Sequence, residues 1–346
     1  MRIGVFSERL RWPFDEGIKN VTVHLSQALA AVHDVLTLTS GGQDNAEYGI
    51  WNIHANRLLL DVRLAHAIRW FRPQALVYIP TACGTVFSFI RARVLRLYGG
   101  GAPTILITLQ PRPHTALGKW LISHLAPDWV LAQSRRTVKE MMSLGCHAAL
   151  LPPAVDTQRF RPASPADKEI LRRRYGIPNT AIVVSHVGHL KTKRNLSHFL
   201  TLQRTRHYHT VVVTSTSTER DKALKESLCN AGGTLIDTYI AHIEDIYRLS
   251  DVYLFLAEED TAAIEVPLSV LEAMSCNLPV ITTPFGGLPD FFSEGKGLFY
   301  WRGETAIVEQ IHAALSRPCA TRELVEPYTW AAAAQTLVGL LQLQDG

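Results

Sequence analysis

Long apolar runs are missing from this sequence. None of its 346 residues lies in a stretch of ~20 consecutive apolar residues, the length that a membrane-spanning helix needs. The opening segment MRIGVFSERLRWPF lacks the apolar stretch of a secretory signal, and residues 3–6 read instead as a first buried strand. We therefore expect a cytoplasmic protein that no transmembrane helix anchors.

Cysteine is scarce, and its spacing forms no pattern. The odd total of five and the absence of a Cys-x-x-Cys pair argue against a disulfide framework and against a zinc site. We expect reduced cysteines with structural roles, and no metal ligand among Cys83, Cys146, Cys229, Cys276 and Cys319.

Two further absences narrow the class of protein. No internal repeat and no low-complexity tract is visible, which excludes solenoids and propellers. No Gly-x-Gly-x-x-Gly follows the first strand, which argues against a dehydrogenase. With 47% hydrophobic and 19% charged residues, the chain has enough apolar surface to fold and too little charge to be disordered.

The net charge of +4 conceals an asymmetry. Residues 1–160 contain 17 Lys and Arg against 10 Asp and Glu, whereas the remainder contains 18 against 21. A basic first half fits an anionic partner such as a membrane surface, and a solvated basic face without a partner is the alternative.

Short apolar runs alternate with helical patterns along nearly the whole chain, in two series. This alternation predicts parallel sheets covered by helices, that is, α/β doubly wound domains. A proline-rich stretch over residues 152–164 separates the series. We therefore predict two domains, residues 1–160 and 161–327, with Ser164 as the N-cap and Pro165 in the first turn of a helix that opens the second.

Ligands of doubly wound sheets bind where strands end and helices begin, because free backbone N–H groups there attract anions. Gly17 opens a helix after the first strand, although a plain turn glycine is an equal alternative. In the second series the strand AIVVS leads to Gly188 and a basic cluster of His189, Lys191, Lys193 and Arg194. A diphosphate suits this cluster, and a solvated basic turn is the alternative.

A third loop leads into a helix that Pro267 is expected to open. Glu272 would lie in this helix and accept two sugar hydroxyls, while free amides at its start point at an anion. A glycine pair after the next strand would allow the backbone to turn close to a ligand. The alternative is a buried helix with surface carboxylates; the residues concerned are Ser269, Val270, Leu271, Glu272, Gly286 and Gly287.

The run VPLSVLEAMSCNLPVITTPFGGLPD resembles the signature region of retaining GT-B glycosyltransferases of family 4, the glycosyl transferases group 1. VGHLKTKRNL resembles the phosphate loop of that family, and LLPPAVDTQRFRP resembles its interdomain segment. The resemblance covers roughly residues 128–332. It implies the GT-B fold: two Rossmann-like domains facing a cleft, with a C-terminal helix of about residues 328–346 that crosses back to the first domain.

The resemblance also implies roles for single residues. Glu272 corresponds to the family glutamate that binds the ribose hydroxyls. Arg194 takes the place of the diphosphate-binding lysine, with Lys193 next in line. His189 stands where the family has an arginine and is a weaker phosphate partner. Gly17 falls near the glycine loop of the family's first domain, and Gly286 and Gly287 match the family's glycine pair. The implied donor is a nucleoside-diphosphate sugar, with no other cofactor.

The sequence departs from the family pattern where the reacting sugar is expected. The residue eight before Glu272 is Ile264 instead of a glutamate, so Glu265 is the predicted catalytic carboxylate. The alternatives for that role are Glu258, Glu259 and Asp260. A family histidine is replaced by Gln110, which leaves His114 as the nearest substitute, and the usual Asn-Gly before Val155 is Pro153-Ala154.

No Asp-x-Asp metal motif occurs, so Lys193, Arg194 and the helix start at Ser269 would balance the charge of the leaving diphosphate. This predicts a metal-independent hexosyltransferase, retaining by resemblance. Arg91, Arg93 and Arg96 on a short helix suggest a peripheral approach to an anionic membrane and a glycan or lipid-linked acceptor, with no nucleic acid. The competing interpretations are a non-catalytic relative that binds nucleotide sugars or serves as a scaffold subunit, a nucleotide-sugar epimerase and a sugar phosphorylase.

Overall fold

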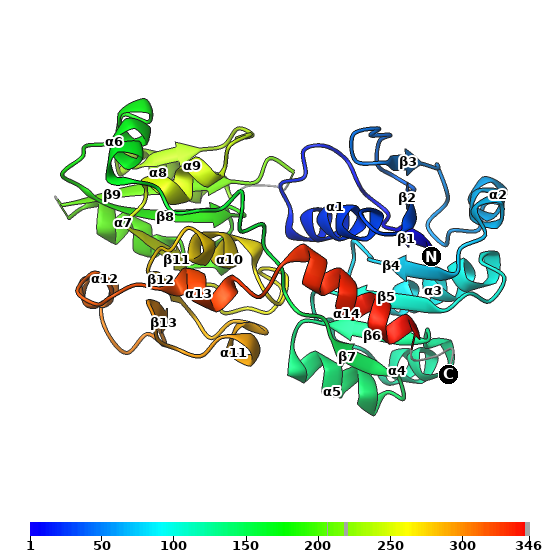
Figure 1. Ribbon diagram of the computed structural model, residues 1–346. Helices are drawn as coiled ribbons and strands as arrows, with labels where there is room; N and C mark the ends of the chain where they lie inside the picture. Colours follow the sequence, from blue (N-terminus) through cyan, green and yellow to red (C-terminus); the bar gives the residue numbers. More distant parts are fainter. Residues whose placement is uncertain (206, 218–220, 343–346) are drawn as a thin grey trace. The chain divides into compact units, whose positions relative to one another are not determined.

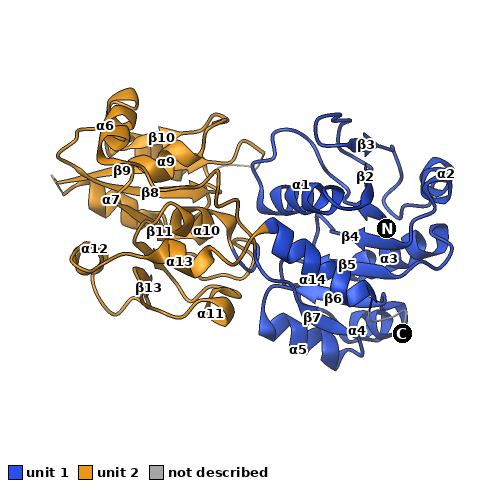
Figure 2. Ribbon diagram, in the orientation of Figure 1, with its two compact units in different colours: residues 1–153, 264–266, 330–346 blue, residues 154–263, 267–329 orange. Residues whose placement is uncertain are grey.

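The computed structural model describes residues 1–205, 207–217 and 221–342 of the chain. The chain forms two compact units (Figure 2). The first unit consists of residues 1–153, 264–266 and 330–346, and the second of residues 154–263 and 267–329. Both units are layers of helices around a parallel sheet, as the alternating sequence pattern predicts (Figure 1).

The first unit contains a seven-stranded parallel sheet in the order β3-β2-β1-β4-β5-β6-β7. Its central strands are buried along their whole length because helices cover both faces of the sheet; every residue of ALVY in β4 and of TILIT in β5 is buried. The strands are β1 (Arg2–Phe6), β2 (Asp34–Thr39), β3 (Ile50–Asn52), β4 (Ala75–Tyr78), β5 (Thr104–Thr108), β6 (Trp129–Ala132) and β7 (Ala148–Leu150).

Two helical layers cover this sheet. Right-handed crossovers that step from β4 to β7 place their helices on one face, and the opposite step from β1 to β2 places its helix on the other. The helices are α1 (Gly17–Ala30), α2 (Val62–Phe71), α3 (Val86–Tyr98), α4 (Ala116–Leu125), α5 (Arg135–Ser143) and α14 (Trp330–Gln342). α14 packs on α1, which confirms that the C-terminal helix returns to the first unit.

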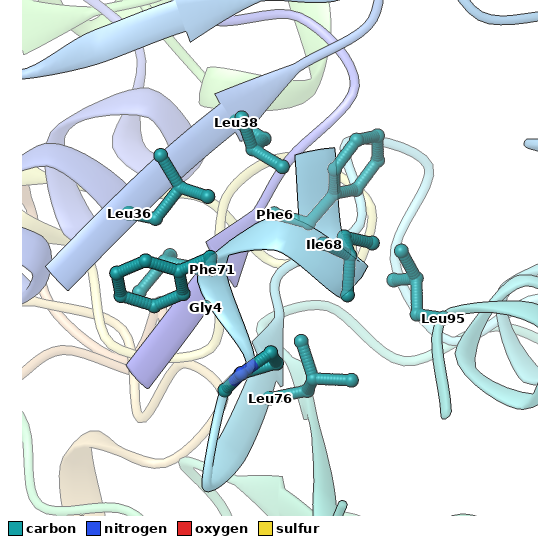
Figure 3. A pocket seen from close by; sticks show the side chains of 10 residues that line it. Gly4, Phe6, Leu36, Leu38, Ile68, Phe71, Leu76 and Leu95 are labelled. Atoms are coloured by element: carbon teal, nitrogen blue, oxygen red, sulfur yellow. The ribbon is translucent and has the colours of Figure 1, made fainter. Parts of the chain in front are cut away.

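The core of the first unit lies between the sheet and the layer of α2 and α3. Figure 3 shows Phe6, Leu36, Leu76 and Leu95 converging there from β1, β2, β4 and α3. The cavity that these side chains enclose has a volume of about 10 Å³ and only apolar walls. It has room for one water molecule at most and offers that molecule no polar partner, so it is a packing gap and no ligand site.

The second unit contains a six-stranded parallel sheet in the order β10-β9-β8-β11-β12-β13. Its strands are β8 (Ile182–Gly188), β9 (Tyr208–Thr214), β10 (Thr234–Ile236), β11 (Val252–Phe255), β12 (Val280–Thr282) and β13 (Leu298–Tyr300). Its helices are α6 (Pro165–Arg174), η1 (Thr192–Arg194), α7 (Ser197–Gln203), α8 (Lys222–Asn230), α9 (Glu244–Leu249), α10 (Leu268–Ser275), α11 (Leu288–Phe291), α12 (Ile307–Leu315) and α13 (Thr321–Val325).

The chain passes from the first unit to the second at Pro153, a few residues before the boundary at residue 160 that the proline-rich stretch suggests. The backbone after Pro153 is already bonded to the second unit: Val155 N donates to Tyr328 O at 2.9 Å, and Ser275 Oγ donates to Phe160 O at 2.5 Å. These partners lie more than a hundred residues further along the chain, so local sequence could not reveal them.

None of the helices in the described part of the chain combines the length and the apolar composition that crossing a membrane requires. All five cysteines lie in described residues, and none of them is paired in a disulfide.

Candidate functional site

A pocket in the second unit lies at the carboxyl end of β8, where ligands of doubly wound sheets bind. The chain leaves β8 at Gly188 and turns through η1 before α7 begins. The pocket has a volume of about 180 Å³ and is lined by His189, Lys191, Lys193, Arg194, Thr261 and Ala262. The structure therefore brings together the whole basic cluster that the sequence singles out, in a shape and charge that suit a diphosphate.

Arg194 differs from the other cations of this pocket because it is buried. Its side chain is 5% exposed, its guanidinium lies 4.9 Å from the centre of the Phe255 ring, and its Nε has no hydrogen-bond partner. Among the residues that the structure describes, no carboxylate lies within ion-pair distance of it. Burial lowers the pKa of Arg194 to about 10. The pocket thus holds a positive charge that the protein itself leaves unbalanced.

Lys193 is placed quite differently. Its side chain is 47% exposed, it forms an ion pair with Glu259, and its Nζ donates to Thr261 Oγ1 at 3.1 Å. Of the two residues proposed for the diphosphate-binding position, Arg194 has no carboxylate partner, whereas Lys193 would first have to break its ion pair with Glu259.

His186 is a neighbour of this pocket that sequence reasoning missed. It is fully buried on β8; its Nδ1 lies 2.9 Å from Leu254 O, and its Nε2 has no partner. Burial, with Arg194 as the second cause, lowers the pKa of His186 to about 3, so the imidazole is neutral. A Cβ atom at Gly188 would lie 3.1 Å from His186 Nε2 and 3.3 Å from an Arg194 nitrogen. A side chain at position 188 would therefore have to push these two side chains aside.

Glu272 lies on α10, which begins after Pro267 as the sequence predicts. Its Oε2 accepts a hydrogen bond of 2.5 Å from the hydroxyl of Tyr247 on α9. Burial raises the pKa of Glu272 to about 7, against the lowering effects of the Tyr247 hydrogen bond and of nearby Arg159. The carboxylate can accept hydroxyls of a ribose once it is ionised, and burial opposes that ionisation.

Tyr247 is the second functional neighbour that the motif comparison did not identify. It is buried on α9, and burial followed by the charge of Glu272 raises the pKa of its hydroxyl well above the usual value. The hydroxyl is therefore a permanent donor that holds the Glu272 carboxylate in place. The contact joins residues 25 positions apart, and no spacing rule connects them.

The start of α10 holds three of the residues that the sequence proposes for the donor site. Val270 N donates to Pro267 O at 3.1 Å, so this amide already has a partner within the first turn. The Ser269 side chain forms a hydrogen bond with the Tyr253 hydroxyl, and the Leu271 side chain is fully buried. Beyond β12, Gly286 has φ +53°, a backbone conformation that favours glycine, and Gly287 precedes the short helix α11.

The first unit holds the other candidates. Gly17 begins α1, and Ile264 packs on it so closely that a Cβ at position 17 would lie 3.0 Å from Ile264 Cδ1. Ile264 itself is 7% exposed. The residue that replaces a family glutamate therefore fills a hydrocarbon contact against the start of α1.

Glu265 is 1% exposed and is bonded to the start of α5. Gln133 N donates to its Oε2 at 2.8 Å, and Ser134 Oγ donates to its Oε1 at 2.5 Å. Thr137 Oγ1 also donates to Oε1, and the Glu265 backbone N donates to Leu109 O at 2.7 Å. Burial is the largest influence on this carboxyl and raises its pKa. Ser134 caps α5 by accepting a hydrogen bond from Thr137 N, and the Glu265 carboxylate holds that serine and ties residues 264–266 to the first unit.

His114 lies just before α4 and is half-buried, and this burial lowers its pKa in spite of the nearby Glu140. Gln110, where the family has a histidine, accepts a 2.8 Å hydrogen bond from Arg112 Nη2. Of the alternatives to Glu265, Glu259 is the carboxylate that pairs with Lys193 in the second unit. The catalytic roles of Glu265 and His114 stay predictions.

Known proteins share both the sequence and the fold. Residues 167–331 match the family model of the glycosyl transferases group 1. The sulfoquinovosyl transferase SQD2 of Arabidopsis thaliana is 26% identical over 227 residues, which cover 61% of this chain and 43% of the relative. The mannosylfructose-phosphate synthase of Agrobacterium fabrum is 25% identical over 225 residues, which cover 57% of this chain and 48% of the relative. The chain spans less than half the length of either relative.

Solved structures match over nearly the whole chain. A glycosyltransferase from Rickettsia africae superposes with a TM-score of 0.78 at 14% identity, covering 99% of this chain and 98% of the other. Anabaena HepE in complex with UDP gives a TM-score of 0.71 at 14% identity, covering 100% and 98%. Residues 167–331 thus match the glycosyl transferases group 1, and the chain has the GT-B fold that the resemblance implies.

Proposed function

We propose that the chain is a retaining, metal-independent glycosyltransferase that moves a hexosyl group from a nucleoside-diphosphate sugar to a glycan or lipid-linked acceptor. The observation that carries this proposal is the buried and unbalanced charge of Arg194 in a 180 Å³ pocket. A protein gains no stability from burying an unpaired cation, so an anionic ligand accounts for it best. Bound UDP in the similar HepE structure supports a nucleotide as that ligand.

The donor is proposed to bind along the carboxyl ends of β8, β11 and β12. The diphosphate would lie against Arg194, with Lys193 and His189 at the rim, and the ribose hydroxyls would bind Glu272. Tyr253 on β11 interacts electrostatically with both Arg194 and Glu272, which supports one continuous site in the second unit. Gly286 and Gly287 would let the backbone approach the donor, and Ser269 and Leu271 would contribute the start of α10.

The reaction breaks the bond between the anomeric carbon and the diphosphate oxygen and forms one to an acceptor oxygen, whose proton ends on the departing diphosphate. Retention requires the acceptor to attack from the face that the diphosphate leaves. Arg194 would stabilise the negative charge that develops on the leaving group, the largest contribution available from fixed charges. His114 and Glu265 are proposed to act at the sugar.

Donor screening tests this function. Among UDP-, GDP- and ADP-sugars, we expect one to raise the melting temperature, and we expect release of its nucleotide to continue undiminished in EDTA. Loss of that release in EDTA would remove metal independence. A donor that binds without turnover would favour the interpretation that the chain is a non-catalytic relative. The residue that supports this interpretation is Ile264, which stands where the family has a glutamate. Conversion of the donor without nucleotide release would indicate an epimerase. If no nucleotide sugar changed the melting temperature, every proposal of an enzymatic function would be contradicted.

Replacing Glu265 by glutamine should lower the free energy of unfolding by about 2 kcal/mol, because one of three buried donors then faces an amide instead of a carboxylate. Its proposed catalytic role adds a fall in kcat of at least about tenfold. Chemical unfolding and transfer kinetics measure the two effects. Thr137→Val is the matched control, since it removes one hydrogen bond from the same carboxylate and should leave kcat unchanged. Full transfer activity in Glu265→Gln would make this residue an anchor of residues 264–266 alone.

The acceptor is proposed to be presented to the first unit of a cytoplasmic protein that touches the inner face of an anionic membrane. Of the three arginines that the sequence suggests for this contact, Arg91 pairs with Glu8 at 2.7 Å and Arg96 pairs with Asp128 at 2.9 Å. Only Arg93 is fully exposed. Ion pairs within the unit thus neutralise two of the three arginines. Other basic residues must provide most of any electrostatic attraction to an anionic membrane.

A further inference from the structure

Large apolar side chains are exposed on the outer face of the layer formed by α2, α3 and α4. The three helices are consecutive in the chain, and α3 packs against both α2 and α4 (Figure 1). Each helix contributes two such side chains, and each of the six is between 57% and 84% exposed: Val62, Trp70, Phe87, Leu97, Leu117 and Trp120. A surface with this much exposed apolar area on neighbouring helices normally marks an interaction site.

The three helices of this face carry basic residues and no acidic ones. Between Asp61 and Asp128 the sequence contains no acidic residue and eight arginines and lysines. Arg69, Arg93 and Lys119 are exposed on the three helices, beside the apolar side chains. At the end of α2 an open groove of about 490 Å³ is lined by Arg2, Arg69, Trp70, Phe71 and Arg72.

We propose that this α2–α3–α4 face binds the surface of an anionic lipid bilayer, with Trp70 and Trp120 among the headgroups and the arginines on lipid phosphates. Tryptophan favours the boundary between water and hydrocarbon, and cations next to apolar side chains are typical of interfacial helices. The inference deepens the proposed function, because it rests on a lipid-linked acceptor and names the surface that would bring the first unit to it.

Charge decides between a bilayer and a second copy of the chain. Self-association through this face would bring arginines against arginines, with no carboxylate of the three helices to balance them. A nucleic acid would match the charge but not the exposed apolar side chains. An anionic bilayer matches both, since its headgroups carry phosphate and its interior takes the apolar groups.

Vesicle sedimentation tests the proposal on the full chain. The protein should bind vesicles of phosphatidylcholine mixed with phosphatidylglycerol and bind phosphatidylcholine vesicles far more weakly. Arg69→Gln with Arg93→Gln should weaken binding to the anionic vesicles about thirtyfold, and Trp70→Ala with Trp120→Ala about tenfold. Trp51→Ala is the matched control: Trp51 is 64% exposed on the edge strand β3, away from these helices, and its loss should change nothing.

All the replaced side chains are exposed, so thermal unfolding should show that the variants stay folded. Unchanged vesicle binding in both double variants, or no binding by the parent protein, would overturn the proposal. The proposal would also be overturned if the protein did not bind vesicles and instead formed a concentration-dependent dimer that the tryptophan replacements abolish. The donor-induced thermal shift, measured on the same variants, should be unaffected. Vesicle binding without any thermal shift from a donor would support the membrane-binding face and contradict the proposed function. A donor-induced thermal shift without vesicle binding would support the proposed function and contradict the membrane-binding face.

Discussion

Replacing Arg194 by methionine should weaken the binding of a nucleoside diphosphate about 300-fold, because a buried charge that meets a phosphate contributes several kcal/mol to affinity. The same replacement should make the free protein more stable. Burial lowers the pKa of Arg194 to about 10, which corresponds to a cost of about 3 kcal/mol for holding the charged form inside the fold. Its contact with Phe255 returns about 1 kcal/mol. Methionine fills similar space without the charge, which leaves a gain of about 2 kcal/mol.

Calorimetric titration with UDP, GDP and ADP and chemical unfolding of the apo protein measure the two effects. Lys193→Met is the matched control, since Lys193 is half-exposed and paired with Glu259. It should weaken nucleotide binding by no more than about threefold and leave stability nearly unchanged. An Arg194→Met protein that binds nucleotide as tightly as its parent would remove Arg194 from the site. A less stable variant would mean that the guanidinium has a structural role.

Local signals in the sequence were enough to predict the helix starts. Ser164 caps α6 with its hydroxyl on Asp167 N, and α10 begins after Pro267, because capping and proline geometry depend only on neighbouring residues. The alternation of apolar runs with helical patterns also predicts both sheets, although it does not mark the edge strand β13. Its three residues, Leu298 to Tyr300, are too short to give a period.

Contacts between distant parts of the chain could not be predicted in this way. Residues 264–266 belong to the first unit although the chain around them belongs to the second, and the bonds that hold Glu265 there reach back more than a hundred residues. The basic cluster was visible in the sequence, but the difference between buried Arg194 and exposed Lys193 was not. Lys193 and Arg194 are adjacent in η1, yet Arg194 is buried and Lys193 is exposed, because the turn directs only one of the two side chains inward. Tertiary packing decides which of them is buried.

Replacing Glu272 by glutamine should make nucleotide binding about a hundredfold weaker at pH values above 7, since the two charge-assisted hydrogen bonds proposed between this carboxylate and the ribose would be lost. In the parent protein the affinity should rise with pH through about 7, because ionisation of Glu272 creates the acceptor that the ribose needs. The variant should lack this rise. Any dependence that it keeps comes from the phosphate of the ligand or from other groups of the protein, so the difference between the two proteins isolates the carboxyl group. Titrations with UDP, GDP and ADP over this range measure it, and equal affinities would exclude Glu272 from the donor site.

The same carboxyl group should also set how stability depends on pH. Its pKa is raised in the folded protein, from 4.5 to about 7, so the folded state keeps the proton longer than the unfolded chain does. The free energy of unfolding should therefore fall as pH rises from about 4.5 through 7, by up to about 3 kcal/mol. Glutamine can still accept the hydrogen bond from Tyr247 but cannot ionise, so the variant should be the more stable protein above pH 7 and the two should converge in acid. Denaturant unfolding at a series of pH values tests this, and parallel curves for the two proteins would show that burial does not hold the proton on Glu272. A carboxylate that lowers stability in the free protein and is needed for the ribose would mark this side chain, like Arg194, as one that the fold retains for its ligand.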